Sequence, residues 1–429
     1  MNAAAHLRRG WCPGALRPMP TGDGLLARLR VSQGRLSLDQ AEAIAQCARR
    51  FGNGIIEISS RANLQLRGIR DAELGALQEG IERLGLLDAN EASESIRNIV
   101  ASPIADLDDS AIVDPAPLVA ALETRLAGDL ALQALPAKFS FVVDGGGALP
   151  LGDVDADIRF TALATPDGSL FEVSLAGEDT IVTQCAPRDL AAAASALARA
   201  FLCEGINAGP QIRRMRHLVG KIGAAVLFAR AKLPIGPPLA GARRRVTPES
   251  WLGAHRYGDI SCVGAAPALG RVSAEGLTLL ARQSRRLGAR DIRLTPWRAL
   301  IVTGLAAEAA QSLVAVLAAA DFITDPANRL LAIVACAGSP ACANAVRDVR
   351  ADALVLASTA PSGRGIVVHM SGCAKGCAHS APAALTFVAR IGGYDLVIDG
   401  KAGDAPVRQD LSRADIVSLL ARQRGATQA

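Results

Sequence analysis

The stretch Gly34-Arg35-Leu36-Ser37 decides the fold, because it returns 236 residues later (34 to 270) as Gly270-Arg271-Val272-Ser273. The same offset relates Gly52 to Gly288. Further pairs at this offset are Arg49 and Arg285, Ile56 and Ile292, Leu64 and Leu300, and Gly68 and Gly304. A gap-free repeat over a strand–helix–strand unit predicts two pseudo-symmetric ferredoxin-like halves. We expect the two halves to form one sheet from distant parts of the chain.

The first copy of the repeat shows how local sequence sets its elements. Ser37 and Gln40 make a capping box that opens a helix, and Gly52 is placed to end it. A strand is predicted from Ile56 to Gly68, where apolar and polar residues alternate. Period two puts a polar set on one face of this strand: Ser59, Arg61, Asn63, Gln65 and Arg67.

Further basic residues lie on neighbouring predicted strands or at their ends. The strand over residues 25–31 carries Arg28 and Arg30 on the face opposite its apolar residues, and Arg97 and Lys138 follow later in the chain. A solvated sheet face would explain any one of them. Their concentration favours a planar ligand with several anionic groups, because guanidinium groups bind carboxylates through two parallel hydrogen bonds.

Four of the nine cysteines form two close pairs, Cys336 with Cys342 and Cys373 with Cys377, and most residues between them are small. A [4Fe–4S] cluster takes four thiolates from loops, and small neighbours let backbone N–H groups point at the cluster sulfur atoms. Zinc sites show shorter spacings, and disulfides are not expected without an export signal. Buried cysteines with no metal are the alternative. The remaining five are expected to be small core hydrophobes: Cys12, Cys47, Cys185, Cys203 and Cys262.

Length and charge narrow the class of protein. A chain of 429 residues, half of them hydrophobic, predicts two to four domains. The net charge of +5 argues against a nucleic-acid partner held by bulk electrostatics. Residues 1–20 lack the apolar core of a signal peptide, and no run is long enough to cross a bilayer, so we expect a cytoplasmic protein with no membrane contact. No G-x-G-x-x-G follows a predicted strand, so electrons would come from another protein.

The repeat and the cysteines together predict an α+β protein in which two ferredoxin-like halves form one domain and two α/β domains are added. The predicted segments are residues 20–90 (first half), 91–250 (α/β, without a cluster), 251–325 (second half) and 326–429 (α/β, with the cluster). The last segment faintly echoes the second, with Ala332–Cys336 against Asn98–Ser102.

The chain resembles the sulfite/nitrite reductase family, whose members pair a [4Fe–4S] cluster with sirohaem. The cysteine spacing is the most specific feature, and the resemblance covers nearly the whole chain, repeat included. It implies a sulfite/nitrite reductase-like fold and a cluster on Cys336, Cys342, Cys373 and Cys377. It implies catalytic roles for Lys138 and Arg298. It also implies a set of residues that bind the tetrapyrrole carboxylates: Arg28, Arg30, Ser59, Arg61, Asn63, Gln65, Arg67 and Arg97.

Two stretches, Arg9–Leu25 and Arg293–Arg298, resemble the precorrin-3B synthase branch of that family, which acts in aerobic cobalamin biosynthesis. Ser140 stands where the reductases commonly carry a second lysine, and this removes a positive charge that would hold sulfite or nitrite. The branch implies O₂-dependent hydroxylation of precorrin-3A and closure of a γ-lactone to give precorrin-3B. The tetrapyrrole is then the substrate rather than a cofactor, so sirohaem is not expected.

Inserting one oxygen atom from O₂ takes two external electrons and a metal or flavin. The implied partners are therefore O₂ and an electron-donor protein, either a ferredoxin or an NAD(P)H-linked reductase. A cluster with four cysteines has no open position, which calls for a second, non-haem iron with His369, His379 and Cys377 as candidates by proximity. The alternatives are a sirohaem-dependent sulfite or nitrite reductase, and an electron-transfer protein that needs no large anion site.

Overall fold

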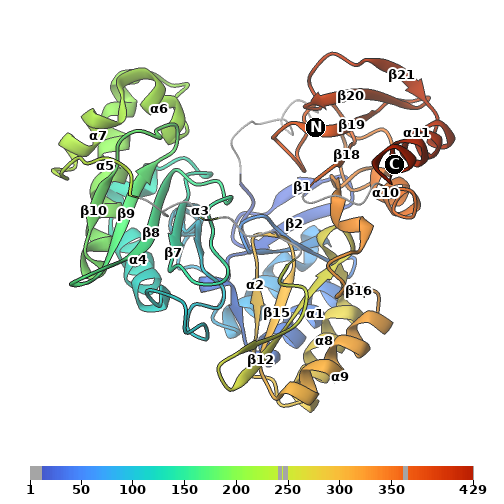
Figure 1. Cartoon of the computed structure of the whole chain (residues 1–429), viewed down its shortest axis with the longest axis horizontal. Helices are drawn as coiled ribbons and strands as arrows, with labels where there is room; N and C mark the ends of the chain where they lie inside the picture. Colours follow the sequence, from blue (N-terminus) through green and yellow to red (C-terminus); the bar gives the residue numbers. More distant parts are fainter. Residues whose placement is uncertain (1–11, 240–243, 245–249, 361–365, 429) are drawn as a thin grey trace.

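The structure, a computed structural model, describes residues 12–239, 244, 250–360 and 366–428. The described chain forms four β-sheets. Figure 1 shows the two halves of the repeat together (blue, and yellow to orange), with the second segment (green) to one side and the C-terminal segment (red) above them. Within this described part, no helix has the length and apolar character needed to span a membrane.

The first sheet has the strand order β1-β2-β5-β4-β13, and its last strand comes from the second half of the repeat. Val272 in that strand lies opposite Ile56 in an antiparallel pairing. The strands are β1 (Met19–Thr21), β2 (Gly24–Leu29), β4 (Ile55–Ile58), β5 (Leu64–Ile69) and β13 (Arg271–Ser273).

The second sheet has the reciprocal arrangement, with the order β11-β12-β15-β14-β3 and β16 paired to β12. Its strand β3 comes from the first half, and Leu36 lies opposite Ile292. The strands are β3 (Arg35–Leu36), β11 (Gly253–Tyr257), β12 (Ile260–Pro267), β14 (Asp291–Leu294), β15 (Leu300–Leu305) and β16 (Phe322–Ile323). The expectation of one shared sheet is therefore wrong. The strand before each helix hydrogen-bonds to the opposite half, which gives two sheets that exchange one strand each.

The helices of the two halves pack together behind these sheets. Ser37 and Gln40 make the predicted capping box, and Gly52 caps the other end of α1. Glu42 on α1 binds Arg282 and Arg285 of α8. The apolar residues of both halves belong to one continuous core. The helices are α1 (Leu38–Phe51), α2 (Leu74–Arg83), α8 (Ala274–Arg286) and α9 (Ala307–Ala319).

Backbone geometry confirms the repeat, because left-handed residues recur at the same offset. Gln33 has φ 55° and Leu269 φ 53°, while Ala62 has φ 52° and Arg298 φ 62°. A positive φ is uncommon for residues other than glycine. Two matched non-glycine pairs therefore show that the halves share one backbone design.

The predicted strand from Ile56 to Gly68 is interrupted. The chain turns between β4 and β5, where the Ser59 amide donates to the Asn63 carbonyl oxygen (2.9 Å) and the Ala62 amide to the Ser59 carbonyl oxygen (3.0 Å). The left-handed Ala62 makes this tight turn. Ser59 and Arg61 consequently lie in a turn rather than on the strand face that carries Gln65.

The second segment is an α/β unit whose sheet has the order β10-β9-β8-β7-β6. Strands β6, β7 and β8 are parallel, and β9 and β10 continue the sheet antiparallel. Its strands are β6 (Ile99–Ala101), β7 (Phe141–Asp144), β8 (Ile158–Thr165), β9 (Gly168–Leu175) and β10 (Thr183–Cys185). Its helices are α3 (Glu91–Ile96), α4 (Ala116–Gly128), α5 (Leu190–Ala208), α6 (Met215–Ile222) and α7 (Ala224–Arg230). Lys138 precedes β7 in a turn, although the sequence predicted a strand there.

The C-terminal segment repeats this plan with the order β17-β18-β19-β20-β21. Its first three strands are parallel and its last two antiparallel, as in the second segment. The faint echo of Asn98–Ser102 in Ala332–Cys336 thus reflects a common topology. Its elements are β17 (Ile333–Ala335), α10 (Val349–Leu356), β18 (Val368–Ser371), β19 (Ala383–Ala389), β20 (Tyr394–Gly400), β21 (Arg408–Leu411) and α11 (Arg413–Gln428).

A buried arginine ties the second half to the start of the second segment. Nη1 of Arg293, which is 1% exposed, lies 2.8 Å from Oδ1 of Asp106, and its Nε lies 2.8 Å from Oδ1 of Asp291. Nη1 also donates to the carbonyl oxygen of Pro103 (2.8 Å). The guanidinium group therefore joins strand β14 to the loop that follows β6.

Candidate active site

Three arginines and a lysine converge on one thiol beside the first sheet. Nη1 of Arg28 lies 2.7 Å from Sγ of Cys12, and Nη1 of Arg61 lies 3.8 Å from the same sulfur. Burial raises the pKa of the Cys12 thiol, but the charges of the arginines and the lysine lower it more, so the net pKa is below its ordinary value. We call the four basic residues the cationic cluster: Arg28, Arg30, Arg61 and Lys138.

Arg30 is the member of the cationic cluster whose hydrogen-bonding capacity is unused. Its side chain is 1% exposed, and none of its three side-chain nitrogens has a hydrogen-bond partner. Oε1 of Glu94 lies 3.8 Å from Nη1 of Arg30 and accepts a hydrogen bond from the Ala15 amide. Burial lowers the pKa of Arg30 to about 10. A buried guanidinium without hydrogen bonds is costly, so the donors of Arg30 are available to an anionic ligand.

Other predicted polar residues of the first half hydrogen-bond to the members of the cationic cluster. Nη2 of Arg28 donates to Oε1 of Gln65 (2.5 Å). Nη2 of Arg61 donates to the carbonyl oxygen of Lys138 (3.3 Å). Oγ of Ser59 accepts from the amides of Arg61 (3.3 Å) and Asn63 (3.2 Å), so Ser59 shapes the turn that presents Arg61.

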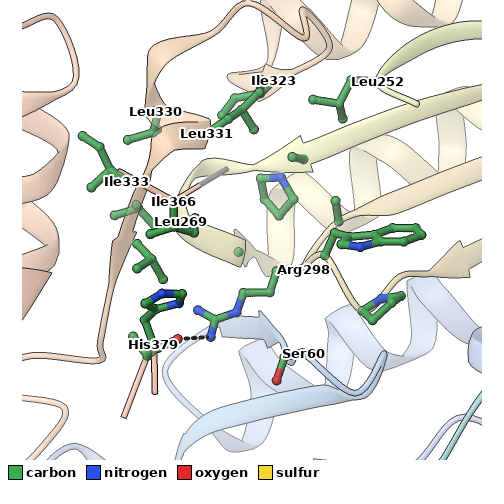
Figure 2. A pocket seen from close by; sticks show the side chains of 18 of the residues that line it. Ser60, Leu252, Leu269, Arg298, Ile323, Leu330, Leu331, Ile333, Ile366 and His379 are labelled. Atoms are coloured by element: carbon green, nitrogen blue, oxygen red, sulfur yellow. Dashed lines mark hydrogen bonds between the residues drawn. The ribbon is translucent and has the colours of Figure 1, made fainter. Parts of the chain in front are cut away.

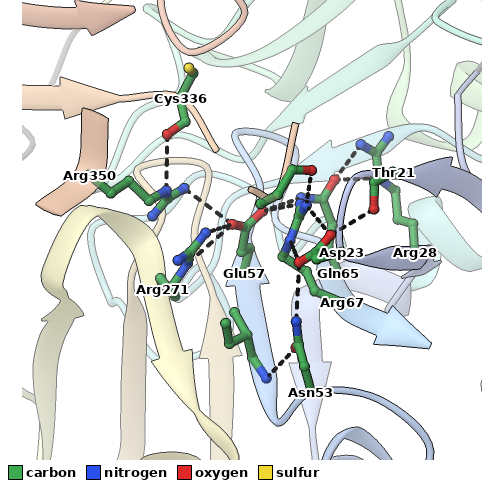
Figure 3. Close-up of polar contacts among 12 residues, drawn as sticks. Thr21, Asp23, Arg28, Asn53, Glu57, Gln65, Arg67, Arg271, Cys336 and Arg350 are labelled. Carbon is green, nitrogen blue, oxygen red and sulfur yellow. Dashed lines mark hydrogen bonds and ion pairs between the residues drawn. The ribbon is translucent and has the colours of Figure 1, made fainter. Parts of the chain in front are cut away.

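Arg67 contacts carboxylates and a carbonyl oxygen of the protein instead of Cys12 (Figure 3). Its Nη2 lies 2.8 Å from Oδ1 of Asp23, its Nη1 3.4 Å from Oε2 of Glu57, and its side chain is 2% exposed. Nη2 also donates to the carbonyl oxygen of Ala341 (2.8 Å), in the loop between the first two paired cysteines. Arg67 therefore uses its donors inside the protein and connects β5 to that loop.

Glu57 is the centre of this network. Its carboxylate lies 2.9 Å from Nη2 of Arg271 and 3.3 Å from Nη2 of Arg350. Nε of Arg350 in turn donates to the carbonyl oxygen of Cys336 (3.1 Å). Burial raises the pKa of Glu57, but Arg350, Arg67 and Arg271 lower it more, so it lies below the ordinary value. One buried carboxylate thus joins the first half, the second half and the cysteine loop.

Arg97 also has partners within the chain. Its Nε lies 2.8 Å from Oδ1 of Asp88 and its Nη1 3.2 Å from Oε1 of Glu123. Nη2 donates to the carbonyl oxygen of Arg30 (2.9 Å). Arg97 accordingly supports the backbone that carries Arg30.

The four paired cysteines lie in loops that follow strands β17 and β18. Sγ of Cys336 accepts a hydrogen bond from the amide of Gly372 (3.1 Å). A Cβ atom on Gly372 would lie 2.6 Å from Cβ of Ala345 and 3.2 Å from the Cys336 sulfur, so glycine is needed there. Burial raises the pKa of Cys336 and of Cys377, and in each the neighbouring thiols of the set raise it further. Four thiols that repel one another's charges and a backbone N–H aimed at sulfur fit an iron–sulfur cluster.

Among the described residues, no group of three or more His, Cys, Asp or Glu side chains could hold a single metal ion. This agrees with a cubane, in which each cysteine binds a different iron atom, so the thiols need not meet at one point. The rings of His369 and His379 lie 5.8 Å apart between centroids, and burial lowers the pKa of His369 to about 4. Within the described residues these histidines and Cys377 do not form a three-ligand group, and the second, non-haem iron stays a prediction.

Arg298 lies at the edge of a mostly apolar cavity of about 310 Å³ between the second half and the cysteine loops (Figure 2). Its Nη2 donates to the carbonyl oxygen of Ala378 (2.9 Å), directly after Cys377. At the repeat offset, Trp297 occupies the position of Arg61. Ala266 likewise occupies the position of Arg30, so the second half does not repeat these two arginines.

Lys138 is affected electrostatically by both the cationic cluster and the cysteine loops. Burial lowers the pKa of Lys138, and the charges of Arg61 and Lys375 lower it further, while those of Cys12 and Cys377 raise it. Ser140, two residues later, is buried; its amide donates to Oδ2 of Asp157 (3.0 Å), and its hydroxyl has no hydrogen-bond partner. The position where a second lysine would stand therefore carries no charge.

Comparisons with known proteins identify the family of the chain. The family model described as the nitrite/sulfite reductase ferredoxin-like half domain matches residues 17–84 and 255–320. The model for the nitrite and sulphite reductase 4Fe-4S domain matches residues 92–238. A precorrin-3B synthase from Sinorhizobium sp is 38% identical over 412 residues, which cover 94% of this chain and 86% of the relative.

The chain belongs to the nitrite and sulfite reductase family. A ferredoxin–nitrite reductase from Synechococcus elongatus is 27% identical over 90% of this chain and 82% of the relative. The solved structure of the Mycobacterium tuberculosis NirA protein matches the fold with a TM-score of 0.77, at 21% identity, over 93% of this chain and 80% of that chain. The predicted fold class is confirmed, and the protein is an oxidoreductase of an iron–sulfur family.

Sequence reasoning about this nitrite and sulfite reductase family member missed two central residues. Cys12 was assigned to the core, but it lies inside the cationic cluster. The basic residues that contact it lie 16 and 49 residues away, so no local pattern reveals it. Glu57 lies between Ile56 and Ile58 in a buried strand. A charged residue inside an apolar strand was the sequence signal that could have identified it.

Proposed function

We propose that the protein is a precorrin-3B synthase, which hydroxylates precorrin-3A with O₂ and closes a γ-lactone in aerobic cobalamin biosynthesis. The 38% identity to a precorrin-3B synthase, over most of both chains, carries this proposal. The ferredoxin–nitrite reductase of Synechococcus elongatus is less similar, at 27%. The cytoplasm, expected from the sequence, remains part of the proposal.

The cationic cluster is the proposed site for the carboxylates of the tetrapyrrole. Arg30 has unused donors in a buried position, and Arg28 and Arg61 present guanidinium groups beside it. Asn63 and Gln65 add amide groups from the same hairpin. We assign Arg67 and Arg97 to positioning rather than ligand contact, because carboxylates and carbonyl oxygens of the protein already occupy their donors.

The paired cysteines are the proposed cluster ligands: Cys336, Cys342, Cys373 and Cys377. A bound [4Fe–4S] cluster supplies one-electron transfer. Lys138 is the member of the cationic cluster whose pKa is also affected by the charge of Cys377, and its ammonium group is the proposed partner of one ligand carboxylate near that relay. We propose a ferredoxin or an NAD(P)H-linked reductase as electron donor and O₂ as the second substrate.

The test is a single-turnover reaction with precorrin-3A, a chemical reductant and ¹⁸O₂. We expect a hydroxylated lactone that carries the label, and no useful reduction of sulfite or nitrite under the same conditions. Efficient reduction of either oxyanion, or equal product without O₂, would overturn the proposal.

A further inference from the structure

Cys12 contacts two of the guanidinium groups of the proposed carboxylate site. Its sulfur lies 2.7 Å from Nη1 of Arg28 and 3.8 Å from Nη1 of Arg61, while the side-chain nitrogens of Arg30 make no hydrogen bonds. The site therefore divides into two parts. One part is filled by a group of the protein itself, and the other is open to a ligand.

Building on the proposed function, we propose that Cys12 determines specificity: its thiolate occupies the place in the cationic cluster that a small inorganic oxyanion would take. Arg30 is thereby left for a carboxylate of the large substrate. Sulfite and nitrite, which have no second point of attachment, are excluded.

The position of Cys12 is built into the fold. The amide of Arg28 donates to the carbonyl oxygen of Gly14 (3.2 Å), and the amides of Ala15 and Leu16 donate to the Glu94 carboxylate at 2.5 and 3.2 Å. A Cβ atom on Gly14 would lie 1.9 Å from Oε2 of Glu94, so glycine is needed at that position. Residues 14–16 are thus hydrogen-bonded to β2 and α3, and these contacts keep the sulfur of Cys12 next to Arg28 and Arg61.

The charges favour a thiolate and disfavour a metal ion at this point. Burial alone would raise the pKa of Cys12, and the four basic residues around it reverse that effect. A thiolate can bind metals, but a cation here would face three guanidinium groups and an ammonium group at close range. A second anion would compete with the sulfur for the same Nη1 atoms of Arg28 and Arg61.

The experiment is isothermal titration of the holoprotein with nitrite and with sulfite in a low-chloride buffer, without tetrapyrrole, reductant or O₂. Wild type, Cys12→Ala and Cys12→Ser are compared. Cys47→Ala serves as the control, because Cys47 is similarly buried but lies outside the site. We expect both Cys12 variants to bind the oxyanions at least tenfold more tightly than wild type and the control. Wild type that binds as tightly as a folded Cys12 variant would overturn the inference.

A second measurement covers the case in which neither Cys12 variant folds. Alkylation of the native wild-type protein by iodoacetamide at several pH values, read for each cysteine peptide by mass spectrometry, separates Cys12 from the cluster ligands, because the thiolate is the reactive form. A Cys12 alkylation rate that changes little from neutral to alkaline pH, while the rate of Cys47 rises, supports the inference. A Cys12 rate that rises with pH in parallel with that of Cys47 overturns it. Neither readout involves precorrin-3A, so a failure here is distinguishable from a failure of the proposed function.

Discussion

Arg67 donates a hydrogen bond to the carbonyl oxygen of Ala341 at 2.8 Å, across 274 residues of sequence. A residue that the sequence assigned to ligand binding thus holds the loop between Cys336 and Cys342. The contact joins the cysteine loop to the first sheet.

Arg67→Ala should lower the free energy of unfolding by about 3–5 kcal/mol, the usual cost of breaking a buried ion pair. The reason is that Asp23 and Glu57 lose a shared partner in a buried place. Chemical denaturation measures this, and iron analysis should show weaker cluster retention. Arg70→Ala is the control, because the Arg70 side chain is 57% exposed. An unchanged stability combined with weaker tetrapyrrole binding would instead make Arg67 a ligand residue.

Arg30→Met should cost less stability than Arg67→Ala. Arg30 makes no hydrogen bonds, and Glu94, which lies 3.8 Å from it, keeps its hydrogen bonds from the amides of Ala15 and Leu16. Binding of a tetrapyrrole polycarboxylate should weaken by about 1.5–3 kcal/mol, the range for hydrogen bonds to charged groups. Thermal unfolding and fluorescence titration measure the two effects. Arg30→Lys should recover part of the affinity. A large loss of stability in Arg30→Met would show that Glu94 is its true partner.

Cys373→Ser should abolish the cluster and destabilise the C-terminal segment, because a cubane needs all four thiolates. Analysis of iron and acid-labile sulfide measures the loss. Cys47→Ser, a buried cysteine on α1, should keep a full cluster. A full cluster in Cys373→Ser would remove this cysteine from the ligand set.

Lowering the pH should weaken the ion pairs of Arg293 with Asp106 and Asp291. Burial raises the pKa of Asp106 and of Asp291, but the hydrogen bonds and charge of Arg293, together with the other basic groups nearby, lower both more, to below the ordinary value of 3.8. These carboxylates therefore stabilise the fold fully above about pH 4, and the stabilisation is lost as the pH falls through the lower, folded-state pKa. Asp291→Asn should cost stability at pH 7 and progressively less toward pH 3. Asp167→Asn, in the exposed turn between β8 and β9, should show no such trend.

The sequence predicted the architecture because the repeat keeps one offset through a whole unit, and because paired cysteines among small residues have few chemical uses. It could not predict the turn at Ala62, since a left-handed alanine leaves no local signal. The sequence also could not predict that β3 and β13 pair with the opposite halves, because the pairing of such short strands is determined by tertiary packing. Strand periodicity singled out Arg28 and Arg30, which stay predicted ligand residues. It could not show that Arg67 and Arg97 are held by Asp23, Glu57 and Asp88, because these contacts join residues distant in sequence.

The strand exchange also affects the order in which the segments can fold during synthesis. Strand β4 is made early, yet its partner β13 at Arg271–Ser273 is translated more than 200 residues later. Until then the nascent chain exposes an unpaired edge at β4, which is a template for wrong pairing. The first half therefore cannot complete its sheet during its own synthesis, and we expect the second segment to fold before either ferredoxin-like half is finished.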